Sequence, residues 1–137
     1  MLPDDTRESS WDSFRDEFMA GYFAVDPHFA VQQGRHEFDG LLPDWSPAGL
    51  QRGVEFLKTS RERAMLFDAA ALNERLQFER DYLLAVIDGA LFWMQDADWP
   101  HRNPFYYADR LDPNVYVSRE YAPLDERLRA YTRWASR

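Results

Sequence analysis

The sequence predicts an all-α fold, an irregular bundle of about five to seven helices around a central helix near residues 73–95. Apolar residues recur at helical spacing in four segments, and prolines stand where those segments begin or end. The alternation in Val115-Tyr116-Val117 is typical of a strand, but no second strand of comparable strength is present to pair with it. No linker or internal repeat interrupts the chain, so residues 1–137 are expected to form a single helical domain.

The first helix is expected from Ser10 to Val25, with Ser10 as its N-cap. Its aromatic stripe consists of Phe14, Phe18 and Tyr22, with Trp11 on a neighbouring strip. Asp26-Pro27 ends this helix, and Pro27 suits the first position of a short second helix. Gly34 would close that helix in a left-handed cap, and residues 35–45 are predicted to form a loop.

The third helix is predicted to begin after the N-cap Ser46 and to reach about Met65. The strongest element runs from about Asn73 to Gln95, and its apolar positions cover so much of its surface that we expect it to be buried on most sides. Its acidic residues fall seven apart on one strip, which indicates a solvated edge formed by Glu74, Asp81 and Asp88.

Proline-spaced aromatic residues from His101 to Ala122 favour short helical turns over strands. The last helix is expected to open at Pro123, and no stop signal closes it before Arg137. Its predicted buried stripe consists of Leu124, Leu128, Tyr131 and Ala135.

Composition excludes several classes of function. The 137 residues include 16 Lys+Arg and 24 Asp+Glu, a net charge of −8, which disfavours nucleic acid and membrane surfaces as partners. The absence of cysteine excludes disulfides, thiolate metal sites and cysteine nucleophiles. Residues 1–10 resemble no targeting signal, and the apolar stretch from Tyr82 to Met94 is shorter than the ~20 residues of a membrane span, so we expect a cytoplasmic location.

The sequence offers no complete catalytic or metal-binding motif. His36-Glu37 begins the His-Glu-x-x-His pattern of zinc peptidases, but position 40 is Gly, and His28 and His101 lack ligand spacing. No Gly-x-Ser-x-Gly turn or glycine-rich phosphate loop is present either. We therefore predict no catalytic residue, no metal ligand and no cofactor for this chain.

One aromatic region is the candidate for a cleft or partner surface. Tyrosines combine an apolar ring with a hydrogen-bonding tip, and they are frequent where a surface meets a ligand. They also staple irregular corners of a core through their hydroxyl groups, and this second interpretation is the favoured one. The candidate surface consists of Asn103, Tyr106, Tyr107, Tyr116, Arg119 and Tyr121.

An ordered set of short motifs resembles the amino-terminal part of a bacterial family, domain of unknown function 885. The resemblance covers nearly the whole chain, and its members follow one another in the family's order. The motifs are Trp11-x-x-Phe14, Tyr22-Phe23, Pro27-x-Phe29-Ala30, Gly34-x-His36, Leu42-Pro43-Asp44 with Ser46, Arg80-Asp81-Tyr82-Leu83-Leu84, Asn103-Pro104-x-Tyr106, Tyr121-Ala122-Pro123-Leu124 and Arg127-Leu128.

The resemblance implies a role as well as a fold. Members of the family are longer, largely helical proteins similar to zinc-dependent peptidases, and their His-Glu-Ala-x-Pro-Gly-His motif lies far toward the carboxyl end. That motif is absent here. We therefore expect an N-terminal helical segment that forms part of the wall of a peptide-binding cleft and is inactive alone. Its expected partners are the remaining C-terminal portion of the protein and a peptide substrate. Zinc is expected only in a full-length protein. The alternative is a free-standing acidic helical binding or dimerisation module, partnered as a homo-dimer.

Overall fold

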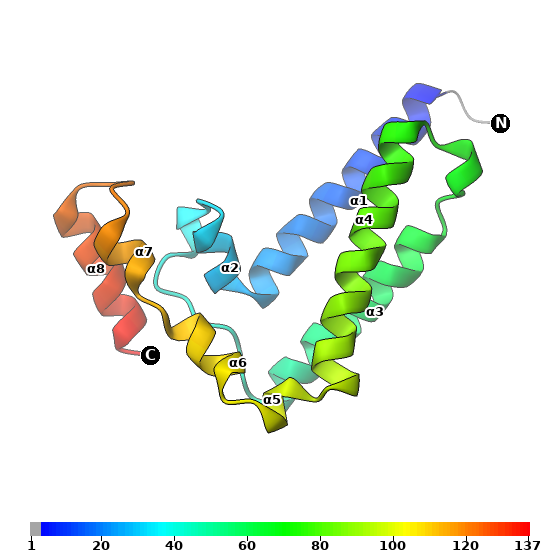
Figure 1. The fold of residues 1–137 in the computed structure, drawn as a ribbon. Coiled ribbons are helices and arrows are strands. Elements are labelled where there is room, and N and C mark those ends of the chain that lie inside the picture. The colour runs from blue at the N-terminus through cyan, green and yellow to red at the C-terminus, as the bar shows by residue number, and fades with distance from the viewer. Residues whose placement is uncertain (1–3) are drawn as a thin grey trace.

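The computed structural model describes residues 4–137 and confirms the all-α fold class, with no strand in that range. Figure 1 shows the long helices side by side in one arm, a group of shorter helices away from them, and short helices that connect the two parts. The arm contains α1 (Asp4–Val25), α3 (Pro47–Met65) and α4 (Glu74–Leu91). The second group contains α2 (Pro27–Gln32), α7 (Asn114–Ser118) and α8 (Leu124–Ala135), and the connectors are α5 (Trp99–Arg102) and α6 (Phe105–Ala108).

The aromatic stripe of α1 forms the core of the arm, as its spacing predicts. Trp11, Phe14 and Phe18 are all buried. The ring of Trp11 meets Phe67 edge-on at 5.2 Å between centroids. The predicted start of this helix at Ser10 is wrong, because α1 begins at Asp4 and the Ser10 hydroxyl donates to the carbonyl of Thr6 within the helix.

Helix α3 begins at the cap that the sequence indicates, and α4 begins where its predicted segment starts. The Ser46 hydroxyl accepts from the backbone N–H of Gly49 at 3.0 Å, and α3 ends at Met65 as predicted. The Asn73 side chain accepts from the N–H of Leu76 at 3.0 Å and starts α4. A π-helical turn, Phe92–Asp96, continues α4 to the predicted end of the central helix.

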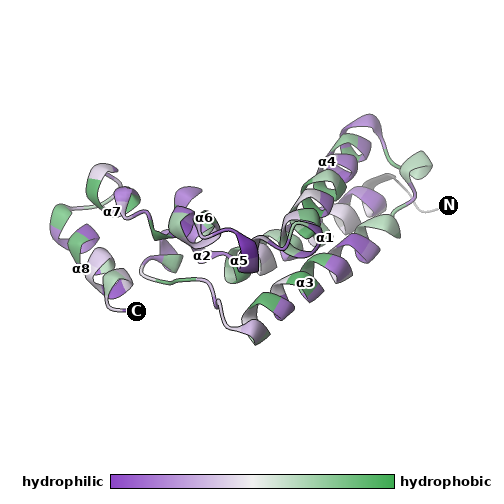
Figure 2. Ribbon diagram, turned by 60° about the horizontal axis from the view of Figure 1, so that its bottom comes forward, coloured by the Kyte–Doolittle hydropathy of each residue, from purple (hydrophilic) through white to green (hydrophobic). Residues whose placement is uncertain are grey.

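The expectation that the central helix is buried on most sides is wrong. Only Leu76 and Ile87 of α4 are fully buried, while Phe78 is 69% exposed and Tyr82 64% exposed. Helices α1 and α3 cover one side of α4, and no fourth long helix of the described chain covers the other (Figure 1). Figure 2 accordingly shows hydrophobic and hydrophilic positions mixed along this helix. The acidic strip is exposed as predicted.

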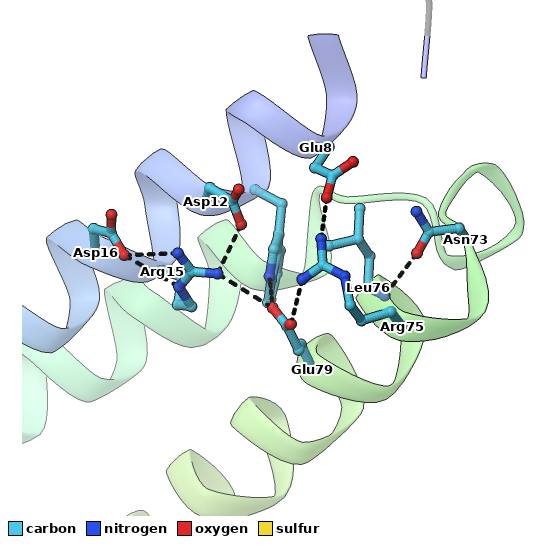
Figure 3. Close-up of polar contacts among 9 residues, drawn as sticks. Glu8, Asp12, Arg15, Asp16, Asn73, Arg75, Leu76 and Glu79 are labelled. Carbon is cyan, nitrogen blue, oxygen red and sulfur yellow. Dashed lines mark hydrogen bonds and ion pairs between the residues drawn. The ribbon is translucent and has the colours of Figure 1, made fainter. Parts of the chain in front are cut away.

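A polar network joins the outer ends of α1 and α4 (Figure 3). One carboxylate oxygen of Glu79 accepts from the indole N–H of Trp11 at 2.8 Å, and the other accepts from Arg75 at 2.6 Å. Arg15 lies between Asp12, at 2.7 Å, and Glu79, at 3.5 Å. Partial burial raises the pKa of the Glu79 carboxyl, but the hydrogen bonds from Trp11 and Arg75 outweigh it and leave that pKa below its usual value.

The second group of helices has a small core of its own. Its buried members are Val31, Val115, Tyr116 and Ala130. Gly34 follows α2 with a φ of +85°, the left-handed conformation that the sequence predicts there. The segment 101–122 forms the predicted short helical turns, and Val115-Tyr116-Val117 lies in α7 rather than in a strand.

The predicted buried stripe of α8 is wrong. Leu124 is 57% exposed and Leu128 46% exposed, whereas Arg127 and Ala130 are the buried residues of this helix. The Arg127 guanidinium donates to three backbone carbonyls, those of Ala122 at 2.9 Å, Val117 at 3.1 Å and Tyr116 at 3.3 Å. These bonds satisfy carbonyl groups at the end of α7, so α8 turns its arginine face inward and two leucines outward.

No helix in the described part of the chain combines the length and apolar character that crossing a membrane requires.

Candidate functional site

An aromatic-lined cavity lies where the arm meets the connecting helices. It has a volume of about 300 Å³ and is bounded by the C-terminal end of α1, the middle of α3, the π-helical turn after α4, and α5 and α6. We call it the aromatic pocket. Its lining residues are Tyr22, Val25, Asp26, Pro43, Gly53, Phe56, Leu57, Ala90, Trp93, Met94, Trp99, Tyr106, Asp109 and Arg110.

Aromatic rings form much of the pocket wall. Trp93 and Trp99 lie with ring centroids 4.3 Å apart, and Phe56 stacks on Phe18 at 5.6 Å. Phe56 reaches this position because Gly21 has no side chain, since a Cβ there would lie 2.4 Å from Cε2 of Phe56. The glycine within α1 therefore shapes the pocket, despite its low helix propensity.

An ion pair crosses the pocket between segments far apart in the sequence. Arg110 Nε donates to Asp26 Oδ2 at 3.1 Å, and Arg110 Nη1 donates to the Tyr106 carbonyl at 3.0 Å. The guanidinium lies 4.6 Å from the centroid of the Tyr106 ring. The other Asp26 oxygen accepts from the N–H of Phe29 at the start of α2. Asp26 thus caps one helix while it fixes the arginine of another segment.

The two tyrosine hydroxyls of the pocket are neutral hydrogen-bonding groups at ordinary pH. Burial raises the pKa of the Tyr22 hydroxyl, and the nearby Asp26 carboxylate raises it further. Burial also raises the pKa of Tyr106, against the opposing effect of Arg110. The pocket therefore presents apolar rings, uncharged hydroxyls, the Asp26–Arg110 ion pair and the carboxylate of Asp109, a combination suited to holding a ligand in a fixed orientation.

Three of the six predicted surface residues lie at or beside this pocket. Tyr106 lines it. The Tyr107 hydroxyl donates to the Pro100 carbonyl at 2.7 Å, and its ring meets Trp45 edge-on. The Asn103 side chain accepts from the N–H of Phe105 at 3.0 Å. Tyr107 and Asn103 thus order the backbone that presents Tyr106.

Of the other three, Tyr116 is a core residue of the second helix group, Tyr121 packs against that core, and Arg119 is exposed on its surface. The buried Tyr116 hydroxyl accepts from the N–H of Gly40 at 3.0 Å, and Arg119 donates to the Gln32 carbonyl at 3.0 Å. Tyr121 donates to Asp39 at 2.8 Å and stacks on His36 at 3.5 Å. Burial raises the pKa of Tyr121 strongly, and its hydrogen bond to the Asp39 carboxylate adds to the effect. Through these contacts the hydroxyl groups of Tyr116 and Tyr121 hold an irregular corner of the core together, and the two residues do not form one continuous surface with Tyr106.

Most of the pocket lies outside the predicted surface. Tyr22 and Trp93 are expected on apolar helical strips, Asp26 is expected to end a helix, and Phe56 and Trp99 belong to no predicted stripe. The spacing of Tyr106 and Arg110 is the one local signal, because residues four apart on a helical turn bring a ring and a guanidinium together. The pairing of Arg110 with Asp26 spans 84 residues, and no local pattern reports it.

The residues present do not fit a zinc site. Among the side chains that the structure describes, no three or more of His, Asp or Glu gather closely enough to hold a metal ion. His36 contacts Asp39 at 3.0 Å and His101 contacts Asp98 at 2.6 Å, but each is an isolated pair. We derive no chemical step through a metal in this chain.

Comparison with protein-family models, curated proteins and solved structures gives no match for this chain.

Proposed function

We propose that this chain is the N-terminal helical segment of a metallopeptidase-like protein of the domain of unknown function 885 family, and that its aromatic pocket is part of the wall of a peptide-binding cleft. The observation that carries the proposal is the pocket itself, with aromatic walls and a fixed Asp26–Arg110 pair. Such a site binds and orients an apolar side chain. The chain's own role is binding, and hydrolysis belongs to a portion that carries the zinc motif.

The residues of the family resemblance support the proposal because many of them determine the fold. Trp11 and Phe14 form the core of the arm. Gly34 adopts the left-handed conformation, and Asn103 orders the turn before α6. Tyr106 contacts the arginine of the pocket. A shared set of such residues is what a shared helical architecture requires.

Calorimetric titration with short capped peptides tests the binding role. We expect Ac-Ala-Phe-Ala-NH2 to bind and Ac-Ala-Glu-Ala-NH2 to bind at least tenfold more weakly, because the pocket is largely apolar and already contains an ion pair. Val25→Phe would fill the pocket from α1. The matched control is Val117→Phe, at an exposed valine outside the pocket. Equal affinity of the two variants for the phenylalanine peptide would contradict the proposal.

Metal analysis and peptide hydrolysis assays test the assignment to a longer peptidase. We expect no stoichiometric zinc and no hydrolysis with residues 1–137 alone. We expect both in a gene product that continues into the His-Glu-Ala-x-Pro-Gly-His motif. Stoichiometric zinc in this chain by itself would overturn the assignment.

A second candidate function, a free-standing acidic binding or dimerisation module, is favoured by the exposed area of the molecule. The chain exposes 8627 Å². A compact monomer of its 16.2 kDa mass would expose about 7,450 Å². The excess exceeds the roughly 800 Å² that each partner buries in a standard protein interface. Surface of this extent is available for a macromolecular partner.

A further inference from the structure

The outer face of α4 carries a row of exposed residues with coiled-coil spacing. Successive members are four, three, four and three residues apart, the spacing at which one helix presents a continuous seam to another. We call this row the α4 seam. It consists of Phe78, Tyr82, Ala85 and Gly89 of α4 and of Phe92, the first residue of the π-helical turn that follows, and all five are exposed.

The seam is distinct from the face of α4 that packs inside the arm. Leu76 is buried against the Trp11 cluster, and Ile87 is buried against Phe18 and Leu57. Leu83 contacts both of these core clusters. Helix α4 is therefore apolar on two sides, and the described part of the chain covers one of them. Exposed aromatic residues in a row are uncommon on a monomer and mark an interaction surface.

The order of large and small residues along the seam is complementary to itself when two copies of the chain pair in antiparallel orientation. In an antiparallel pairing, Phe78 lies opposite Gly89 of the second copy, and Tyr82 lies opposite Ala85 of the second copy. A Cβ placed on Gly89 would meet no atom within 4 Å, so the space above this glycine is open to a partner's ring. A parallel pairing would instead set glycine against glycine and leave a void.

We propose that the α4 seam is a homodimer interface in which two copies pair through antiparallel α4 helices. The pairing has two-fold symmetry, so each contact between the copies occurs twice: Phe78 of each copy packs against Gly89 of the other. The available area is consistent with the interface, because the molecule exposes more surface than a compact monomer by over 1,000 Å².

The charges beside the seam permit this pairing. Asp81 is ion-paired with Arg80 at 2.9 Å, and Asp88 is ion-paired with Arg61 at 2.6 Å. Two of the three acidic residues on this strip are thus compensated within each copy, and the exposed Glu74 at the start of α4 adds negative charge beside the seam. The net charge of −8 per chain still opposes association, so added salt is expected to strengthen the dimer.

Sedimentation equilibrium on the full chain tests the interface. We expect the mass to rise from 16.2 kDa toward twice that value with concentration. Ala85→Glu should weaken the dimer at least tenfold, because it places a charge in the middle of the seam. Its matched control, Ala135→Glu at an exposed alanine of α8, should leave the association unchanged. A chain that stays monomeric at millimolar concentration would overturn the proposal and assign the seam to a different protein segment.

The orientation of the two helices has its own test, which the absence of cysteine makes simple. A spin label on Glu74→Cys, at the start of α4, should report a label separation of about 30 Å in the antiparallel dimer, since the helix rises 1.5 Å per residue. A separation near the interhelix distance of about 10 Å would contradict the antiparallel register. Val25→Phe, which blocks the aromatic pocket, should leave both measurements unchanged, so dimerisation and peptide binding can fail independently.

Discussion

The three-helix arm and the α2–α7–α8 group are stabilised in different ways. The arm packs large side chains between long helices, with Trp11, Leu76 and Ile87 fully buried. Its ion pairs lie at the rim, where water screens them. The second group has a small core. Its stability depends on hydrogen bonds between side chains and backbone groups that are distant in the sequence. Gly40 donates to Tyr116, and Arg127 donates to carbonyls of α7.

The difference shows where each part of the molecule is vulnerable. In the arm, one lost ring opens a cavity in a continuous apolar core. In the second group, one lost polar atom leaves a buried backbone partner without its hydrogen bond. Substitutions that keep shape but remove polarity should therefore separate the two regions.

Trp11→Ala should give the largest effect. The indole is fully buried, its N–H donates to Glu79, and its ring contacts Phe14 and Phe67. We expect a loss of about 3–5 kcal/mol in the free energy of unfolding, measured by urea denaturation. The control is Phe105→Ala, at a ring that is 73% exposed, which should change stability little. Comparable losses from the two variants would show that the arm has no central aromatic core.

Arg127→Met should disrupt the second group without opening a cavity. It keeps most of the side-chain volume but leaves three carbonyl groups without their donor. We expect a loss of about 2–4 kcal/mol, with amide exchange accelerated first in α7 and α8. Arg129→Met on the exposed side of the same helix removes only a surface pair with Asp125. If exchange accelerates equally in α1 and α4, the two regions do not differ as described.

Tyr116→Phe tests a single polar atom in the same group. The hydroxyl accepts from the buried N–H of Gly40, which has a φ of +80° and lies against Arg133. We expect a loss of about 1–3 kcal/mol, because the N–H retains its desolvation cost without a partner. The control is Tyr131→Phe, which removes the same hydroxyl group from a tyrosine that is only partly buried. Unchanged stability in Tyr116→Phe would indicate that water reaches Gly40.

Glu79→Gln tests the polar rim of the arm through its pH dependence. The pKa of Glu79 is lowered in the folded state, so the ionised carboxylate stabilises the protein above the unfolded pKa of about 4.5. That stabilisation is lost as pH falls through the lower folded pKa. We expect Glu79→Gln to lower the free energy of unfolding by about 1 kcal/mol at pH 7 and by progressively less below pH 4.5. Urea denaturation at a series of pH values measures this difference. A cost independent of pH would contradict a role for the charge.

Leu128→Ser should have the smallest effect. The periodicity of α8 places this leucine in the core, but the structure leaves it 46% exposed. We expect a change within about 0.5 kcal/mol. A loss above about 2 kcal/mol in the free energy of unfolding would indicate that Leu128 is buried, as the sequence predicts, and that Arg127 is not on the buried face.

Local signals were sufficient for the helices and insufficient for the pocket. The cap at Ser46, the start of α4 near Asn73 and the stops at Pro27 and Gly34 depend on signals within a few residues, and the structure confirms them. The aromatic pocket combines α1, α3, α5 and α6 with the turn after α4. Its members look like ordinary core residues until the helices are placed in space. The expectation that the tyrosines staple a core corner describes Tyr116 and Tyr121.

The sequence by itself determined the all-α class, the positions of α3 and α4 and the solvated acidic strip of α4, because spacing and capping act along one helix. Tertiary structure alone decided which apolar face is buried. Helix α4 has two such faces, and only that of Leu76 and Ile87 meets α1 and α3. Helix α8 buries Arg127 in place of Leu128. Carbonyl groups left without a donor near the end of α7 would cost more free energy than an exposed leucine side chain does.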